Sequence, residues 1–344
     1  MTPTIDAIQV VTTGTKPGSD ASFIAIHGAQ RTGWYGPVST EVGQHAEKLL
    51  THAVVGESAI DHHALHAAMC QATYDDPSPV ASWAVGALDC AAWDLHGQLA
   101  QVPVCDLLAR SPELTVPLYA SWLGLDIAHP TPAATVRQVG HSGWRFTKWG
   151  LRRDPANDTL AEASRLTAAT QAVASALGNA AAFDAVFTWD TALAGLIASQ
   201  IDPADVLWVE DPLPLFDPEA YRSLAVQTPL ALGERLFLHD DTRALLDLRP
   251  KAFTLDVAAC GGLTRAVDLV ITAGTQRIPV YPHGRSFVPA VHLAAAYPDT
   301  IPAVEYRLQW EPVRQHQYLR PNKPVDGVIT VPSSPGLGAA PRSH

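Results

Sequence analysis

A series of eight short apolar runs, separated by helical segments, constrains the fold more than any other feature of the sequence. The runs cover residues 115–121, 144–150, 181–187, 206–211, 229–235, 252–258, 278–284 and 301–306. They are apolar along most of their length instead of at alternate positions, which is typical of parallel strands buried on both faces. Helical patterns fall between them, at residues 158–177, 191–200, 218–227, 239–248 and 263–276. This alternation predicts an α/β protein whose parallel sheet closes into a (β/α)8-type barrel.

A polar side chain lies at or near the carboxyl end of each run from the second onward. The residues are Lys148, Asp184, Glu210, Glu234, Asp256, His283 and Glu305. Any one of them alone reads as a solvated strand end. The carboxyl ends of all barrel strands meet at one face, however, and that face carries the active sites of such folds. The whole series therefore predicts one cavity lined by acids, a lysine and a histidine.

Acids from three adjacent strands form a candidate metal site. In the stretch VLWVEDPLPLF (206–216), an apolar strand stops at Glu210 and Asp211, and a proline then prevents its continuation. A buried carboxylate is costly unless a cation or several donors satisfy it. Asp184, Glu210 and Glu234 offer only carboxylate oxygens, which favour Mg²⁺ over a zinc site built from histidines. Asp211 is expected to accept hydrogen bonds behind the metal ligands.

The strand order places a lysine and a histidine on opposite sides of this metal site. Lys148 precedes the acids along the chain, and His283 follows them, with Asp256 on the strand beside it. A carboxylate next to an imidazole orients the ring and raises its basicity. The His283–Asp256 pair is therefore a candidate for proton transfer.

Composition bounds the class of protein and its partners. The chain of 344 residues is 47% hydrophobic and 17% charged, which predicts a compact globular protein of one large domain or two. Its formal charge of −11 argues against nucleic acid or an anionic membrane as the main partner, but not against a small carboxylate substrate. We expect neither a signal peptide nor a membrane span. The scattered cysteines indicate reduced thiols, so we expect a cytoplasmic protein, and further a homo-oligomer between a dimer and an octamer.

Several segments resemble the enolase superfamily, specifically its mandelate racemase and muconate lactonizing branch. The matching segments are ALDCAAWDLHGQLAQVPVCDLL (87–108), VPLYAS (116–121), LWVEDPLP (207–214), LALGERL (230–236), LDVAACGGLTRA (255–266), VYPHG (280–284) and VPSSPGLG (331–338). Each segment alone is a weak signal. Together they extend over most of the chain, and the combination is highly specific.

The resemblance implies a more detailed fold and a chemistry. An α+β capping domain, residues 1–114 completed by residues 315–344, would close over a modified (β/α)7β barrel at residues 115–314. The family abstracts a proton α to a carboxylate while Mg²⁺ holds the enediolate. This agrees with the weak acidity of such a proton and with the charge of the intermediate.

The resemblance also implies a role for each residue at the strand ends. By position, Asp184, Glu210 and Glu234 match the metal ligands of the family. Lys148 matches the second lysine of its K-x-K motif, and the His283–Asp256 pair matches its catalytic dyad. Glu305 matches an acid that donates a hydrogen bond to the substrate carboxylate in racemases.

The sequence departs from the family pattern at three places. Phe146 replaces the first lysine of K-x-K, so the neighbouring charge that lowers the pKa of the second lysine is missing. Val186 stands where the family often has asparagine. The first hairpin turn, at about residues 14–22, is short and predicts a reduced capping loop.

Two further features have alternative interpretations. The GGLT stretch at 261–264 can hold an anion on backbone amides, but close packing of a helix on the sheet is the commoner cause of such glycines. Trp34 and Tyr35 can line the lid of the site or pack into the core.

Two chemistries fit groups placed on both faces of a carboxylate substrate. We favour dehydration of an acid sugar, an aldonate or aldarate, in which His283 also helps hydroxide to leave. The alternative is racemisation or epimerisation, in which Lys148 and His283 exchange the α-proton. Cycloisomerisation fits less well, because the cycloisomerases of the family that the sequence resembles use lysines on both faces. A non-catalytic barrel also fits less well, because a protein without chemical demand has no reason to keep buried charges.

Overall fold

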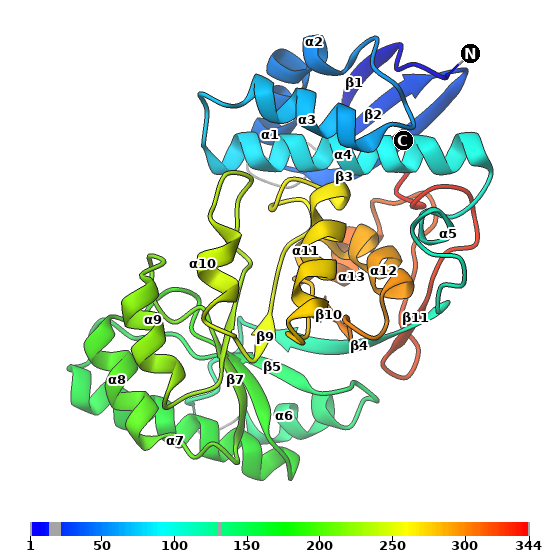
Figure 1. Cartoon of the computed structure of the whole chain (residues 1–344). Helices are drawn as coiled ribbons and strands as arrows, with labels where there is room; N and C mark the ends of the chain where they lie inside the picture. Colours follow the sequence, from blue (N-terminus) through cyan, green and yellow to red (C-terminus); the bar gives the residue numbers. More distant parts are fainter. Residues whose placement is uncertain (1, 14–21, 130–131, 343–344) are drawn as a thin grey trace.

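An antiparallel sheet and several helices form the N-terminal part of the chain (Figure 1). We describe a computed structural model that covers residues 2–13, 22–129 and 132–342. The strands are β1 (Ala7–Thr12), β2 (Ser22–Gly28) and β3 (Arg31–Val38). The helices are α1 (Thr40–His45), the π-helix η1 (Ala46–Leu50), α2 (Thr51–Val54), α3 (His62–Ala72), α4 (Pro79–Ala100) and α5 (Val104–Leu108). β1 and β2 pair antiparallel, and the short turn predicted at about residues 14–22 lies, except for Ser22, outside the described part of the chain.

A parallel sheet forms the larger part and confirms the predicted barrel architecture. Its strands are β4 (Thr115–Trp122), β5 (Thr147–Gly150), β6 (Ala181–Asp184), β7 (Val206–Glu210), β8 (Leu230–Leu232), β9 (Ala252–Phe253) and β10 (Val304–Arg307). Their spatial order is β10-β4-β5-β6-β7-β8-β9.

The segment at 278–284 connects the two ends of this sheet. Phe253 of β9 forms a parallel bridge with Val280, and the backbone N–H of Glu305 in β10 donates to the carbonyl of Pro282 at 3.2 Å. The predicted strand is reduced to a bridge because Pro279 and Pro282 have no N–H to donate to a ladder.

Four of the five predicted helical segments are observed within about two residues of their expected ends, the segment at 239–248 shortens to five residues, and the other helices were not predicted. The helices between the strands are α6 (Ala133–Gly140), α7 (Thr159–Leu177), α8 (Thr191–Gln200), α9 (Pro218–Ala225), α10 (Thr242–Leu246), α11 (Leu263–Thr275), the 3-10 helix η2 (Gly284–Ser286), α12 (Phe287–Ala296) and α13 (Glu311–Gln315). Helices α7 to α10 each begin after an aspartate whose side chain accepts backbone N–H groups of the first turn. Such caps satisfy donors that have no partner inside the helix, which fixes where these helices start.

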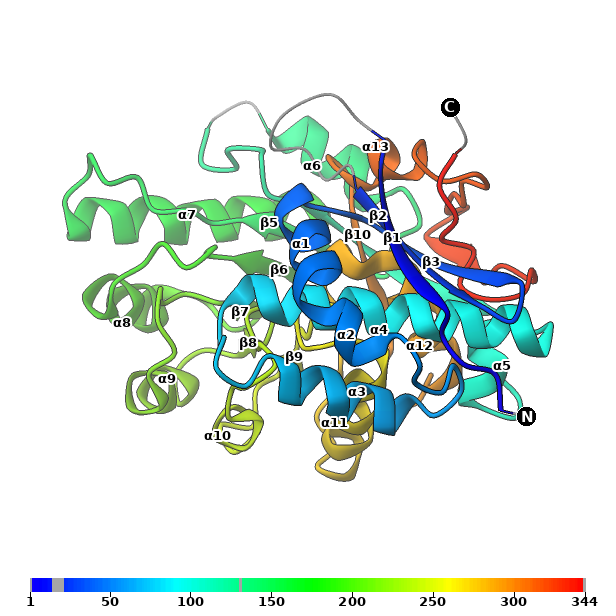
Figure 2. The same ribbon diagram turned by 90° about the horizontal axis from the view of Figure 1, so that it is seen from above.

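Helix α4 joins the capping elements to the barrel (Figures 1 and 2). A Cβ on Gly86 would lie 1.9 Å from the carbonyl oxygen of Ala258, so only glycine lets the helix approach the loop after β9 this closely. The carboxylate of Asp89 accepts from Thr264 N at 2.9 Å and from Thr264 Oγ1 at 2.6 Å, at the start of α11. A Cβ on Gly262 would lie 2.5 Å from Asp89. The GGLT stretch therefore serves close packing, and the carboxylate at its amides is the protein's own.

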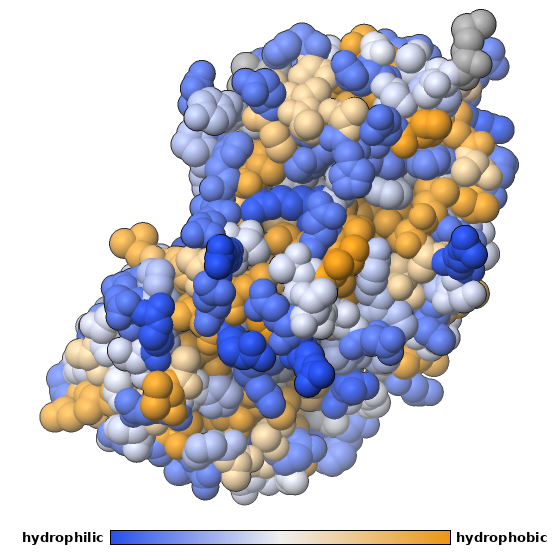
Figure 3. All heavy atoms as spheres, in the orientation of Figure 1, coloured by the Kyte–Doolittle hydropathy of each residue, from blue (hydrophilic) through white to orange (hydrophobic). Residues whose placement is uncertain are grey.

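The C-terminal segment returns along both parts of the molecule. Its strand β11 (Val328–Thr330) pairs antiparallel with β4, and Leu337 N donates to Asp94 Oδ1 at 2.5 Å on α4. The tail thus packs against the capping helices as expected, while the boundaries at residues 114 and 315 remain a prediction. Within the described residues, no helix has the length and apolarity to cross a membrane. Hydrophilic and apolar side chains mix over the face in Figure 3, whose outline is indented between the capping helices and the side of α9 and α10.

Candidate active site

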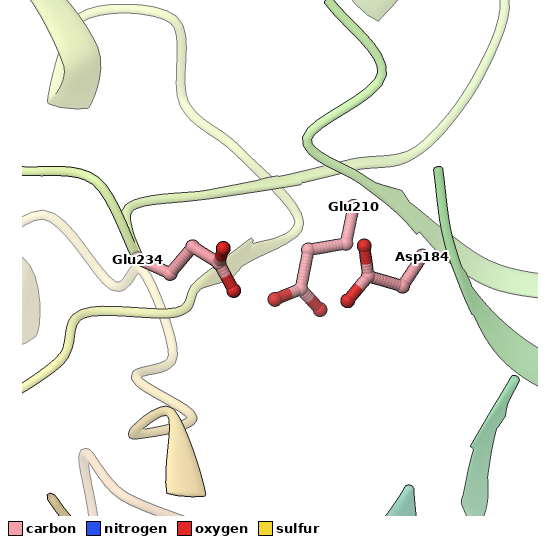
Figure 4. Close-up of side chains that lie close together, drawn as sticks. All are labelled: Asp184, Glu210 and Glu234. Carbon is pink, nitrogen blue, oxygen red and sulfur yellow. The ribbon is translucent and has the colours of Figure 1, made fainter. Parts of the chain in front are cut away.

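The predicted acid triad comes together at the carboxyl ends of β6, β7 and β8 (Figure 4). One carboxylate oxygen from each of Asp184, Glu210 and Glu234 lies within 4.8 Å of the other two. Asp184 and Glu210 are register partners of adjacent parallel strands, so their side chains leave the sheet in the same direction. Glu234 follows Gly233, whose φ of 137° is readily adopted only by glycine. A Cβ at this position would also clash with the ring of Phe253.

Lys148 lies at the centre of the buried charges. Its Nζ is 2.8 Å from Glu210 Oε2, 3.1 Å from Glu305 Oε1 and 3.3 Å from Asp184 Oδ2. Burial by itself lowers the pKa of this lysine, but Glu210 and Glu305 outweigh that effect and raise its pKa well above the usual value. Lys148 is therefore held as an ammonium ion in this arrangement.

The acids exceed the cations that face them. Burial raises the pKa of Glu210 to about 8, although Lys148 opposes the shift, and the neighbouring acids add to it. Glu210 Oε1 is buried without a hydrogen-bond partner among the described residues. An unsatisfied carboxylate oxygen at the meeting point of three hard ligands is what a divalent cation such as Mg²⁺ would complete.

The predicted dyad is present on the other side of the triad. His283 Nδ1 lies 2.9 Å from Asp256 Oδ2, and because burial is outweighed by the bond from His283, the pKa of Asp256 is lowered. The carboxylate can only accept, so Nδ1 carries a proton, and Nε2 faces Glu234 at 3.4 Å. Despite burial, Glu234, Glu305 and Asp256 raise the pKa of His283 to about 8.

Glu305 lies between the lysine and the histidine. It accepts from Gly284 N at 2.7 Å and its Oε2 is 3.7 Å from His283 Nε2. Burial favours the neutral acid, but Lys148 and His283 prevail and lower the pKa of Glu305. In this arrangement Glu305 accepts hydrogen bonds, so the donation to substrate that the resemblance implies stays a prediction.

Asp211 does not behave as expected. Its Oδ2 is buried and has no hydrogen-bond partner among the described residues. Burial, reinforced by Glu234 and Glu210, raises the pKa of Asp211 well above the usual value for an aspartate. The predicted hydrogen bonds to this oxygen are therefore missing, and the residue adopts a positive φ of 40° where the strand ends.

A chain of hydrogen bonds links the dyad to the capping sheet, and sequence reasoning missed it. Ser286 donates its hydroxyl hydrogen to Asp256 Oδ1 at 2.5 Å, and the hydroxyl of Tyr35 in β3 donates to Ser286 Oγ at 3.2 Å. Asp256 also accepts from Ala258 N at 3.1 Å and Ala259 N at 3.0 Å. Tyr35 thus packs in the core and is linked to the dyad through the hydroxyl of Ser286. The only signal for Ser286 was its position three residues after the histidine, in HGRS.

This capped barrel, with acids, a lysine and a histidine at its strand ends, has the architecture of a class of lyases and isomerases. The chain belongs to the enolase superfamily: residues 132–344 match the family model described as enolase C-terminal domain-like. Residues 24–109 match the model described as mandelate racemase / muconate lactonizing enzyme, N-terminal domain. Both matches confirm the resemblance found in the sequence.

Characterised relatives agree with this membership. D-xylonate dehydratase of Haloferax volcanii is 28% identical over 313 residues, which are 83% of this chain and 74% of the relative. D-galactonate dehydratase of Ralstonia pickettii is 26% identical over 270 residues, which are 73% and 68% of the two chains. The chain is thus an enzyme of the lyase or isomerase class, and the alternative of a non-catalytic barrel loses its support.

Solved structures share the fold over nearly the whole chain. A racemase from Streptomyces coelicolor A3(2), solved with bound magnesium, has a TM-score of 0.78 and 22% identity. The match covers 98% of this chain and 97% of the other.

Proposed function

We propose that the protein is a Mg²⁺-dependent dehydratase of acid sugars. The observation that carries the proposal is the placement of two proton-carrying groups, Lys148 and the His283–Asp256 dyad, around one triad of carboxylates. The similarity to dehydratases of D-xylonate and D-galactonate supports an acid sugar as the substrate.

Each group at the strand ends has a distinct task in this reaction. Asp184, Glu210 and Glu234 would hold Mg²⁺, which when bound supplies positive charge for a substrate carboxylate as its α-proton leaves. His283 takes that proton from C2 on Nε2, because its Nδ1 is committed to Asp256.

The same histidine can complete the elimination. The C3–O bond breaks with its electron pair on oxygen, and His283 returns the proton to this oxygen, so that water departs. The resulting enol becomes the 2-keto-3-deoxy acid. Lys148 stays on the other side of the triad, where its ammonium can donate to the substrate carboxylate, and Glu305 keeps both groups in place.

A racemase or epimerase is the second candidate. Lys148 and His283 lie on different sides of the triad, as a transfer of the α-proton between two faces requires. In that reaction the proton leaves one face and another returns to the opposite face, and no water is lost.

Incubation with Mg²⁺ and a panel of aldonic and aldaric acids tests the proposal. We expect 2-keto-3-deoxy products, and no product after removal of the metal with a chelator. Exchange of α-deuterium without any loss of water would refute dehydration and favour the racemase.

We further propose a homo-oligomeric enzyme of the cytoplasm. The free state of Cys70, Cys90, Cys105 and Cys260 supports a reducing location. Light scattering after size-exclusion chromatography tests the assembly, and a monomer at micromolar concentration would contradict it.

A further inference from the structure

Arg307 lies at the carboxyl end of β10, on the catalytic face of the barrel. It is two residues beyond Glu305 on the same strand, so its side chain leaves the strand toward the same interior side, about 7 Å further along. A Cβ on Gly284, the residue after His283, would lie 3.0 Å from Arg307 Cγ. The side chain thus borders the dyad at the mouth of the site.

The side chain of Arg307 is largely buried and forms no ion pair with another described residue. The residue is 8% exposed, and its Nε is buried without a hydrogen-bond partner in the described part of the chain. Its observed contact is with the ring of Trp310, whose centroid lies 4.9 Å from Arg307 Cζ. Burial lowers the pKa of Arg307, and the more distant Glu305 offsets this only in part. A buried charge of this kind is costly until an anion pairs with it.

A second unsatisfied group lies beside it on the neighbouring strand. Ser121 of β4 is the register partner of Arg307 across the two parallel strands, so the two side chains point to the same side. Ser121 is 1% exposed, and its hydroxyl has no partner among the described residues. A guanidinium and a hydroxyl side by side offer several donors to one planar anion.

Lys148 differs from Arg307 in this respect. Lys148 meets three carboxylates, so the protein itself neutralises it. Among the described residues, Nε of Arg307 and the hydroxyl of Ser121 have no such partner, although both residues belong to the same barrel interior. Hydroxyl groups of a sugar do not neutralise a guanidinium, whereas a carboxylate matches it in charge and in planar geometry.

We propose that Arg307 and Ser121 bind a second carboxylate of the substrate, so that the enzyme prefers aldarates, the dicarboxylic acid sugars, over aldonates. The inference rests on the proposed function, since the first carboxylate is the one held at the triad. Arg307 acts here as a specificity-determining residue.

The test compares galactarate with galactonate, which differ in one terminal group, on wild type and on Arg307→Gln in the presence of Mg²⁺. Calorimetric binding and steady-state kinetics are measured for both acids. Wild type should bind galactarate more tightly than galactonate. In Arg307→Gln the affinity for galactarate should fall about tenfold or more, while that for galactonate changes less than about twofold. Ser121→Ala should shift the same preference by a smaller factor.

Two controls separate binding from a structural role. Arg243→Gln, on α10 with a side chain 88% exposed, should change neither affinity. The melting temperature of unliganded Arg307→Gln should stay the same or rise, because an uncompensated buried charge is removed.

Three outcomes overturn the proposal: equal losses for both acids, a lower melting temperature with the preference unchanged, or no measurable binding of galactarate. Because binding is read without turnover, tight galactarate binding that depends on Arg307 would support the subsite even if no water were eliminated. Dehydration of both acids without dependence on Arg307 would leave the proposed function intact and remove this inference.

Discussion

Two layers of side chains fill the barrel interior, and they differ in character although they come from the same strands. The upper layer, at the strand ends, is charged, and at five of its seven positions the residue two places earlier is aromatic or alanine. The pairs are Lys148 over Phe146, Asp184 over Ala182, Glu210 over Trp208, His283 over Tyr281 and Glu305 over Ala303. Residues two apart on a strand point the same way, so the residues of both layers face the barrel interior. The charged residues of the active site and the packing residues below them differ only in their depth in the barrel.

The lower layer is held by contacts between rings. Phe146 stacks on Tyr119 with ring centroids 4.6 Å apart and meets Trp208 edge-on at 5.1 Å. Tyr281 lies 4.9 Å from Trp208. Such pairs stabilise a fixed floor. Phe146 belongs to this floor, and a lysine in its place would carry a charge into an aromatic cluster. The family's first lysine is therefore replaced by a ring that packs in the aromatic layer. The charged groups in contact with Lys148 are then the carboxylates of the upper layer.

The largest effect on activity is expected from the charged layer. Glu210→Gln should keep the fold but abolish turnover and weaken Mg²⁺ binding, because a neutral amide is a poor ligand for a hard cation. Calorimetric titration and a dehydration assay measure both. Glu219→Gln, whose side chain is 84% exposed on α9, is the matched control. Full activity of Glu210→Gln at micromolar Mg²⁺ would refute the metal assignment.

The next effect separates the two proton carriers. His283→Asn should lose turnover and α-proton exchange by about 10²–10⁴-fold, the contribution of a general base. Lys148→Ala should lose turnover too but retain part of the exchange, since His283 is still present. Proton exchange in D₂O distinguishes them. Exchange that survives in His283→Asn and disappears in Lys148→Ala would reverse the two roles.

A smaller loss is expected behind the charged layer. Ser286→Ala removes a donor to Asp256 and should lower kcat about 10–100-fold with little change in KM, because outer partners of this kind orient the catalytic ring. Ser199→Ala, on the exposed side of α8, is the control. A variant that changed KM alone would show that Ser286 does not act through the dyad.

The smallest effect on activity is expected from the aromatic layer. Phe146→Ala should lower the free energy of unfolding by about 3 kcal/mol, near the lower end for such truncations because the ring is only partly buried. Mg²⁺ affinity should stay unchanged. Urea unfolding measures the stability, with the more exposed Phe216→Ala as control. If Phe146→Ala lost Mg²⁺ binding without losing stability, the aromatic layer would not have the purely structural role assigned to it here.

The sequence predicted the strand-end residues because one local rule specifies them. An apolar run that stops at a charge, repeated along the chain, places each of those charges at the same face of a parallel barrel. Asp184, Glu210 and Glu234 meet as expected, and His283 meets Asp256. Most helices between these strands were equally predictable, since the apolar periodicity of a helix is local in the chain.

The partners of those side chains were not visible in the sequence. Tyr35 and Ser286 are 251 residues apart, and Asp89 and Thr264 are 175 apart, so no local pattern joins them. Asp211 was expected to be hydrogen-bonded, but its Oδ2 has no partner among the described residues, and no local pattern distinguishes Arg307, whose Nε is buried without one. Periodicity and strand ends determine which side chains face a common cavity. Whether a buried charge in that cavity is neutralised depends on distances between distant segments, which only the packed tertiary structure decides.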